Sequence, residues 1–162
     1  MPAKPQRYYE DIAVGKTRES SRYTVSSEEI LEFARRYDPQ YFHADKEAAQ
    51  RSRFGEVIAS GIQIMAIWRC LDHEIAHDIA WICGVAWDDV RFPKALRPGD
   101  TVHAKATCLD KRISEKDPTR GVVVFKYLLL DESDEIIWSC KSTNLIERRS
   151  ATGHGKRAEY RR

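Results

Sequence analysis

An aspartate and a histidine stand close together in the sequence, and a glycine follows them at the start of an apolar stretch. These residues are Asp38, His43 and Gly61. A carboxylate and an imidazole can hold a water molecule between them and transfer its proton. A backbone N–H at a helix N-terminus can stabilise negative charge on an acyl oxygen. An isolated Asp and His would indicate only a turn and a loop histidine, but the three residues together indicate acid/base chemistry.

Asp38 is predicted to lie where a helix ends. Ser26 and Glu29 fit a capping box, and apolar residues then recur at helical spacing from Ile30 to Tyr37. The residue before a proline is disfavoured in helical conformation, so Pro39 predicts a helix end at Asp38. A side chain at such an exit can project into a cleft.

Gly61 is predicted to begin a long helix. Asp45 can cap a short helix over 46–51. Gly55 is expected to interrupt the regular structure after that helix. From Gly61 to Ile79 there is no further Gly or Pro, and apolar residues fall three and four apart, which predicts a buried helix of roughly five turns. Ser60 precedes this helix, and an N-cap role is favoured over a nucleophilic one.

The remaining apolar runs read as strands, because they are rich in β-branched and aromatic residues. They cover 17–25, 81–85, 89–92, 101–109, 121–130 and 135–146. The order of elements is one strand, several helices and then a run of antiparallel strands. The sequence therefore predicts an α+β fold with an antiparallel sheet laid against a central helix.

Length and charge favour one domain with a basic tail. The chain has 162 residues, of which 32% are charged and 42% hydrophobic. Residues 148–162 carry six Lys or Arg against the single acid Glu159. Without them, the chain's 27 basic and 25 acidic residues become 21 and 24, a net charge of −3. We predict a domain over 1–147 and a disordered, solubilising tail over 148–162, with no nucleic-acid role.

The sequence shows no sign of export or membrane insertion. No apolar run reaches the roughly 18–20 residues that span a bilayer, and no apolar segment follows the basic residues near Met1. We therefore expect a cytoplasmic protein without membrane contact. The four cysteines, Cys70, Cys83, Cys108 and Cys140, form no C-x-x-C pair and are expected to be small core residues.

A metal-binding motif is present and needs a separate interpretation. His73-Glu74-Ile75-Ala76-His77 reads H-E-x-x-H, which on a helix places two imidazoles on one face. A zinc hydrolase also needs a third ligand and an open cleft, and nothing singles out Asp88, Asp89 or His103 as that ligand. We interpret the motif as a solvated helix end and expect no metal.

The chain resembles the MaoC-like dehydratases, which include the R-specific enoyl-CoA hydratases. The resemblance covers about residues 8–147, and the residues that carry it are Asp38-Pro39-Gln40-Tyr41-Phe42-His43-Ala44-Asp45, then Ala48, Ala49, Phe54, Ile58 and Gly61, and the later stretch from Val90 to Asp100. The chain departs from the pattern at Gln40, where Asn is usual, at Pro39, which is shifted next to the acid, and at Ala66, where a serine can stand.

The resemblance implies a hot-dog fold, in which an antiparallel sheet wraps around one long helix. It implies that Asp38 and His43 are the catalytic pair, and that Gly61, with Ser60 beside it, binds the thioester oxygen. The implied reaction is reversible addition of water to a trans-2-enoyl thioester, giving the (R)-3-hydroxyacyl product. No cofactor is implied, the carrier is CoA or acyl carrier protein, and a homodimer or higher oligomer is expected.

Two other functions remain open from the sequence. A hot-dog protein can hydrolyse thioesters instead of hydrating them, and a non-catalytic member can bind acyl-CoA or a partner. The acyl group itself is not specified by Asp38, His43 and Gly61.

Overall fold

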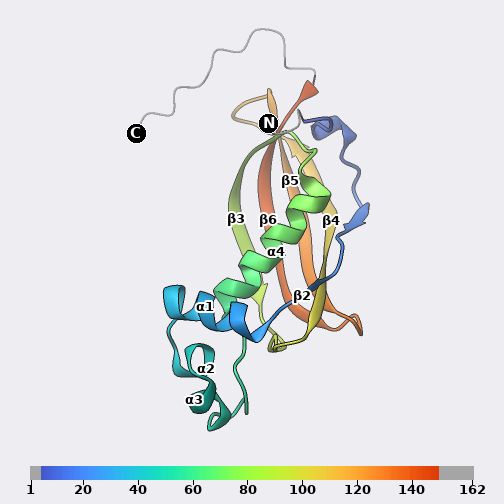
Figure 1. The fold of residues 1–162 in the computed structure, drawn as a ribbon. Coiled ribbons are helices and arrows are strands. Elements are labelled where there is room, and N and C mark those ends of the chain that lie inside the picture. Colours follow the sequence, from blue (N-terminus) through green and yellow to red (C-terminus); the bar gives the residue numbers. More distant parts are fainter. Residues whose placement is uncertain (1–4, 150–162) are drawn as a thin grey trace.

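The computed structural model describes residues 5–149, and it consists of one curved sheet around a long helix (Figure 1). The elements follow one another in the order η1 (Tyr9–Asp11), β1 (Thr17–Glu19), β2 (Tyr23–Thr24), α1 (Ser27–Tyr37), α2 (Tyr41–Ala44), α3 (Lys46–Gln50), α4 (Gly61–Ala76), β3 (Trp81–Arg91), β4 (Thr101–Ile113), β5 (Arg120–Asp131) and β6 (Ile136–Glu147). The strand order is β1-β4-β5-β6-β3, with β2 also paired to β4, and all pairs are antiparallel. This is the α+β fold that the sequence predicts, and it is the hot-dog fold that the family resemblance implies.

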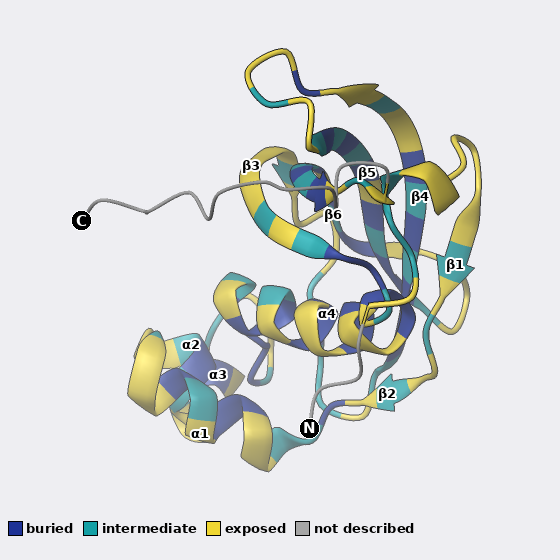
Figure 2. Cartoon of the chain, turned by 90° about the horizontal axis from the view of Figure 1, so that it is seen from above, coloured by how far each residue is buried: buried dark blue, intermediate teal, exposed yellow. Residues whose placement is uncertain are grey.

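The core forms where α4 meets the concave face of the sheet. Residues three and four apart on α4, including Ile64, Trp68, Leu71 and Ile75, are all buried. Figure 2 shows the buried side of α4 turned toward the sheet and its other side exposed. The tightly packed aromatic centre of this core is Trp68, whose ring lies 4.5 Å from that of Trp138.

The three central strands supply the other half of the core. Along β5 the side chains alternate between buried and more exposed positions, from Val123 to Leu129. Such alternation is expected of an antiparallel sheet with one face on the core. β3 is the edge strand next to β6 and remains largely exposed.

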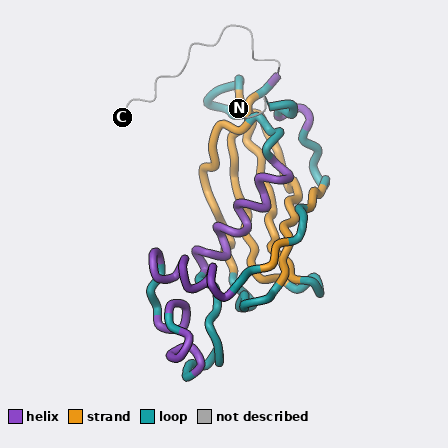
Figure 3. The backbone as a smooth tube through the Cα atoms, viewed as in Figure 1, coloured by secondary structure: helices purple, strands orange, loops and turns teal. Residues whose placement is uncertain are grey.

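The short helices form a separate layer at the N-terminal end of α4 (Figure 3). The predicted capping box holds the start of α1, because Ser26 accepts from the Glu29 N–H and Glu29 accepts from the Ser26 N–H. Asp45 caps α3 by accepting from the Ala48 N–H. This layer positions the loop that carries Asp38.

Three predicted elements differ from the structure. The strand expected over 17–25 is split, because the Ser20 hydroxyl replaces a backbone acceptor and binds the Ala104 N–H at 2.9 Å. The two strands expected over 81–92 are one strand, β3, whose bulges absorb Gly84 and Asp89. The long helix ends at Ala76 rather than Ile79, and α2 was not predicted.

The predicted tail lies mostly outside the described residues, which end at Arg149. Arg148 and Arg149, assigned to that tail, contact the N-terminal segment. Arg148 pairs with Glu10 at 3.2 Å, and the Arg149 side chain pairs with Asp11. Within residues 5–149, the helices are too short or too polar to cross a bilayer.

Candidate functional site

Asp38 lies at the end of α1, as Pro39 predicts. Its N–H donates to the Ala34 carbonyl at 2.9 Å, and its φ of −152° has left the helical region. The Asp38 carbonyl accepts from the Gln40 N–H at 2.8 Å. These bonds fix the backbone on both sides of a half-buried carboxyl side chain.

His43 lies on α2, whose first turn begins directly after Pro39. The Gln40 carbonyl accepts from the His43 N–H at 2.9 Å and from the Ala44 N–H at 3.0 Å. The chain therefore carries Asp38 and His43 on one continuous hydrogen-bonded turn. Among the described residues, no hydrogen bond joins the two side chains directly.

The His43 ring is buried and bound to the backbone. Its exposed fraction is 6%, and its Nδ1 lies 2.6 Å from the Ile58 carbonyl oxygen. A carbonyl oxygen only accepts, so Nδ1 carries a proton, and in the neutral ring Nε2 is then the nitrogen with the lone pair. The ring is also packed edge-on against Phe42, with 4.4 Å between centroids. His43 is thus held as the tautomer in which Nε2 can accept a proton.

The same contact brings His43 close to the start of α4. The Ile58 N–H donates back to the Phe42 carbonyl at 3.3 Å, so α2 and the strand-like segment before α4 are bound in both directions. Three residues further along, Gly61 is the first residue of α4. The structure therefore brings two of the predicted residues, His43 and Gly61, to one corner of the molecule.

Ser60 is the N-cap of α4. It is fully buried, and its hydroxyl oxygen accepts from the Gln63 N–H at 3.3 Å. As the cap residue it satisfies one of the free N–H groups at the helix start. The Gly61 N–H, at the first helical position, has no acceptor four residues earlier within the helix.

Gly61 is close to an aromatic ring that the sequence does not predict there. A Cβ placed on Gly61 would lie 3.1 Å from Cε1 of Phe92, which follows β3. Glycine at this position therefore lets the end of β3 approach the start of α4. Phe92 belongs to the stretch that resembles the family, yet nothing in the sequence indicates its contact with Gly61.

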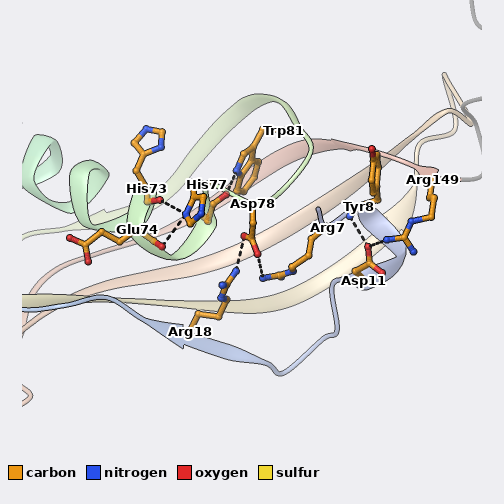
Figure 4. A network of polar contacts seen from close by, with 11 residues as sticks. Arg7, Tyr8, Asp11, Arg18, His73, Glu74, His77, Asp78, Trp81 and Arg149 are labelled. Atoms are coloured by element: carbon orange, nitrogen blue, oxygen red, sulfur yellow. Dashed lines mark hydrogen bonds and ion pairs between the residues drawn. The ribbon is translucent and has the colours of Figure 1, made fainter. Parts of the chain in front are cut away.

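The H-E-x-x-H side chains do not converge (Figure 4). The His77 Nδ1 lies 3.2 Å from the carbonyl oxygens of both His73 and Glu74, while the Glu74 carboxylate accepts from the Ser21 N–H at 3.0 Å. Burial, with the nearby Arg69 and His77, lowers the pKa of His73. Within residues 5–149, no three His, Cys, Asp or Glu side chains are grouped as metal ligands.

The cysteines only partly follow the prediction that they are core residues. Cys108 and Cys140 are buried, but Cys70 is exposed on α4 and Cys83 is half-buried on β3. Cys70 lies on the outer side of α4. It stands among apolar residues in the sequence, so the spacing of apolar residues did not show that it is exposed.

Comparison with known proteins identifies the family. The MaoC-like domain matches residues 11–126. The chain belongs to this family. An uncharacterised protein of Bacillus subtilis is 33% identical over 104 residues, which are 64% of this chain and 74% of that protein.

Solved structures of the family have the same fold. A MaoC-like dehydratase from Rhodospirillum rubrum is 32% identical, with a TM-score of 0.79 over 88% of this chain and 98% of that one. An R-hydratase from Pseudomonas aeruginosa is 17% identical, with a TM-score of 0.70 over 86% of this chain and 84% of that one. The second likeness concerns the fold alone.

Proposed function

We propose that this MaoC-like protein catalyses the reversible hydration of a trans-2-enoyl thioester to the (R)-3-hydroxyacyl thioester. The observation that carries the proposal is the contact between His43 and the Ile58 carbonyl, since it leaves Nε2 free to act as a base. The MaoC-like dehydratase from Rhodospirillum rubrum, at 32% identity, supports the same reaction class.

In this mechanism Asp38 and His43 hold the attacking water. Nε2 of His43 takes one proton while the water oxygen bonds to the β-carbon of the enoyl group. The electron pair of the double bond moves to the thioester, which becomes an enolate. The proton then passes to the α-carbon, and the pair returns to its starting state. Asp38 orients the water and balances the charge that His43 gains.

Gly61 is proposed to stabilise the enolate oxygen through its backbone N–H. The N-terminus of a helix of 16 residues adds a favourable partial positive charge at the same point. Ser60 supports this role indirectly, because its hydroxyl caps α4 and so holds the start of the helix in place. The side chains named here need no bound cofactor, and the substrate brings its own CoA or acyl carrier protein.

A homodimer is proposed to form along β3. This strand is at the edge of the sheet, and its side chains Ile82, Val85 and Trp87 are 38%, 54% and 48% exposed. An unpaired edge with exposed apolar side chains is favourable for pairing with a second copy. Analytical ultracentrifugation tests this, and a Val85→Lys variant should remain monomeric.

The reaction is tested by mixing the protein with enoyl-CoA thioesters of graded length. Hydration removes the enoyl absorbance without releasing a thiol, whereas release of free CoA identifies a thioesterase. Binding without turnover would identify a non-catalytic acyl-CoA-binding protein. Loss of hydration in Asp38→Asn supports the proposed pair, and hydration at the wild-type rate in that variant would contradict it.

A further inference from the structure

A cavity lies between α1 and α4, on the side of α4 that faces away from β3 (Figure 2). Its volume is about 370 Å³. Cavities of about 300–1,000 Å³ are typical of sites for small organic molecules. The residues that line it stand three and four apart on each helix, as Glu29, Glu32 and Phe33 do on α1, so one continuous face of each helix forms a wall.

The cavity is separate from the proposed thioester site and from the proposed dimer surface. Asp38, His43 and Gly61 do not line it, and no residue of β3 does. A second copy that pairs with β3 is therefore not expected to fill it. A ligand of this cavity would be an additional one.

Gln63 places a polar group without a partner in this cavity. It lines the cavity from α4, its exposed fraction is 4%, and its Oε1 is buried without a hydrogen bond among the described residues. The backbone N–H of Gln63 donates to Ser60, but the side chain takes no part in that cap. Leaving a buried acceptor without a donor is unfavourable, so a ligand that brings an N–H or O–H group would satisfy Gln63.

The walls of the cavity are aromatic and aliphatic. Phe33 and Tyr37 line it from α1 with 4.9 Å between their ring centroids, and Tyr23 lines it from β2. Ile67 and Leu71 line it from α4, and both are buried. Such walls favour an apolar body, and the faces of aromatic rings also attract cations.

The exposed rim of the cavity is acidic. Glu29, Glu32 and Glu74 are exposed and line it together with a single base, Arg36, which gives these four residues a net charge of −2. The hydrogen bond from the Tyr23 hydroxyl lowers the pKa of Glu29, so this carboxylate stays ionised at neutral pH. The rim therefore attracts a cation and repels an anion.

We propose that this cavity binds a small organic amine in its ammonium form, with an aromatic or aliphatic body. The ammonium group donates to Oε1 of Gln63, its charge lies in the field of the three glutamates, and its body packs against Phe33 and Ile67. An alcohol would supply the donor without the charge. A carboxylate would meet the acidic rim and bring a second acceptor to Gln63.

Three probes with one body and different head groups test the proposal. They are 3-phenylpropylamine, 3-phenylpropanol and 3-phenylpropionate, and isothermal titration calorimetry measures their binding. We expect the amine to bind about tenfold or more tightly than the alcohol, because a charged donor gains more from the acceptor and from the rings. The carboxylate should bind most weakly.

Two variants separate the donor from the charge. Gln63→Met removes the acceptor at a similar volume, so the affinities for the amine and the alcohol should both fall by about fivefold or more. Glu32→Gln changes an exposed side chain, so it tests the proposal even if Gln63→Met fails to fold. Only the amine should then weaken, by about two- to fivefold. Glu47→Gln on α3, outside the cavity, is the matched control and should change no affinity.

The cysteines report where the amine binds. Cys70 is exposed and lines the cavity, whereas Cys83 is half-buried on β3 and lies outside it. Saturating 3-phenylpropylamine should slow the reaction of Cys70 with N-ethylmaleimide and leave that of Cys83 unchanged. Mass spectrometry of the labelled protein measures both reactions.

Several results would overturn the proposal. They are equal or tighter binding of the alcohol or the carboxylate, no binding of any probe, wild-type affinity for the amine in Gln63→Met, and labelling of Cys70 that the amine does not slow. Displacement of the amine by saturating butyryl-CoA would also overturn it, because the cavity would then belong to the thioester site. No probe is a thioester, so failure of the proposed hydration would leave the expected binding unchanged.

Discussion

The ring of His43 donates from Nδ1 to the carbonyl oxygen of Ile58, at 2.6 Å. This bond determines which nitrogen of the imidazole carries the proton, and it anchors the helix that bears the histidine to the segment that leads into α4. Removing it should therefore affect both chemistry and stability, and the two effects can be separated by the choice of substitution.

His43→Asn and His43→Gln form an informative pair. The asparagine amide can take the place of Nδ1 and still donate to Ile58, whereas the glutamine amide reaches toward the position of Nε2. Both variants lose the base, so hydration should fall by about 10²–10⁴-fold. Only His43→Gln should leave the buried carbonyl without a donor, at a cost of about 1–3 kcal/mol in the free energy of unfolding.

Urea unfolding and enoyl-CoA hydration, measured on both variants, check this prediction. Equal stabilities for the two variants would show that the contact with Ile58 contributes little. Wild-type turnover in His43→Asn would remove His43 from the mechanism.

The effect of Gly61→Ala should be determined by the contact of the new Cβ with Phe92 rather than by the helix propensity of alanine. Alanine is favoured over glycine in helices by up to about 1 kcal/mol, but the new Cβ would stand 3.1 Å from the Phe92 ring. We expect Gly61→Ala to reduce hydration, because the ring must shift at the thioester site. In a Phe92→Ala background the same change should be neutral or stabilising.

A double-mutant cycle by urea unfolding measures this coupling between Gly61 and Phe92. Additive effects of the two substitutions would show that the ring and the glycine do not restrict one another.

Ser60→Ala tests whether Ser60 acts as a cap or takes part in chemistry. Loss of the hydroxyl removes the acceptor for the Gln63 N–H, which typically costs about 1 kcal/mol of stability. Hydration per folded molecule should stay within a few-fold of wild type. A loss as large as that expected for His43 would show that the Ser60 hydroxyl contacts the substrate.

Features that depend on neighbouring residues could be predicted from the sequence. The Ser26–Glu29 capping box, the helix end before Pro39 and the apolar face of α4 all follow from local spacing. These features place Asp38 at a helix exit and Gly61 at a helix start. With the order of the elements along the chain, they indicate an α+β fold, and the resemblance to the MaoC-like dehydratases implies the hot dog.

Features that join distant segments could not be predicted. The approach of Phe92 to Gly61 and the bond between His43 and Ile58 depend on how loops pack, and neither has a sequence signal of its own. Gly121 is similar, because a Cβ there would lie 1.9 Å from the ring of Tyr9, more than one hundred residues earlier.

Asp72 should make the stability of the protein depend on pH in a direction unusual for a carboxylate. Burial raises the pKa of Asp72 from 3.8 to about 6, although the neighbouring Arg69 opposes the shift. Between about pH 4 and pH 6 the folded state holds a proton that the unfolded state has lost. The contribution of this group is therefore most favourable below about pH 4 and is lost as pH rises through about 6.

Comparison with Asp72→Asn isolates this effect, because all other groups titrate in both proteins. A shift of about two units corresponds to about 3 kcal/mol. Urea unfolding should thus show wild type losing about that much stability relative to Asp72→Asn between about pH 4 and about pH 7. Asp110→Asn, at an exposed position on β4, is the control and should run parallel to wild type. A constant difference between wild type and Asp72→Asn across this range would mean that the Asp72 carboxylate is already ionised at the acid end, held by Arg69 despite its burial.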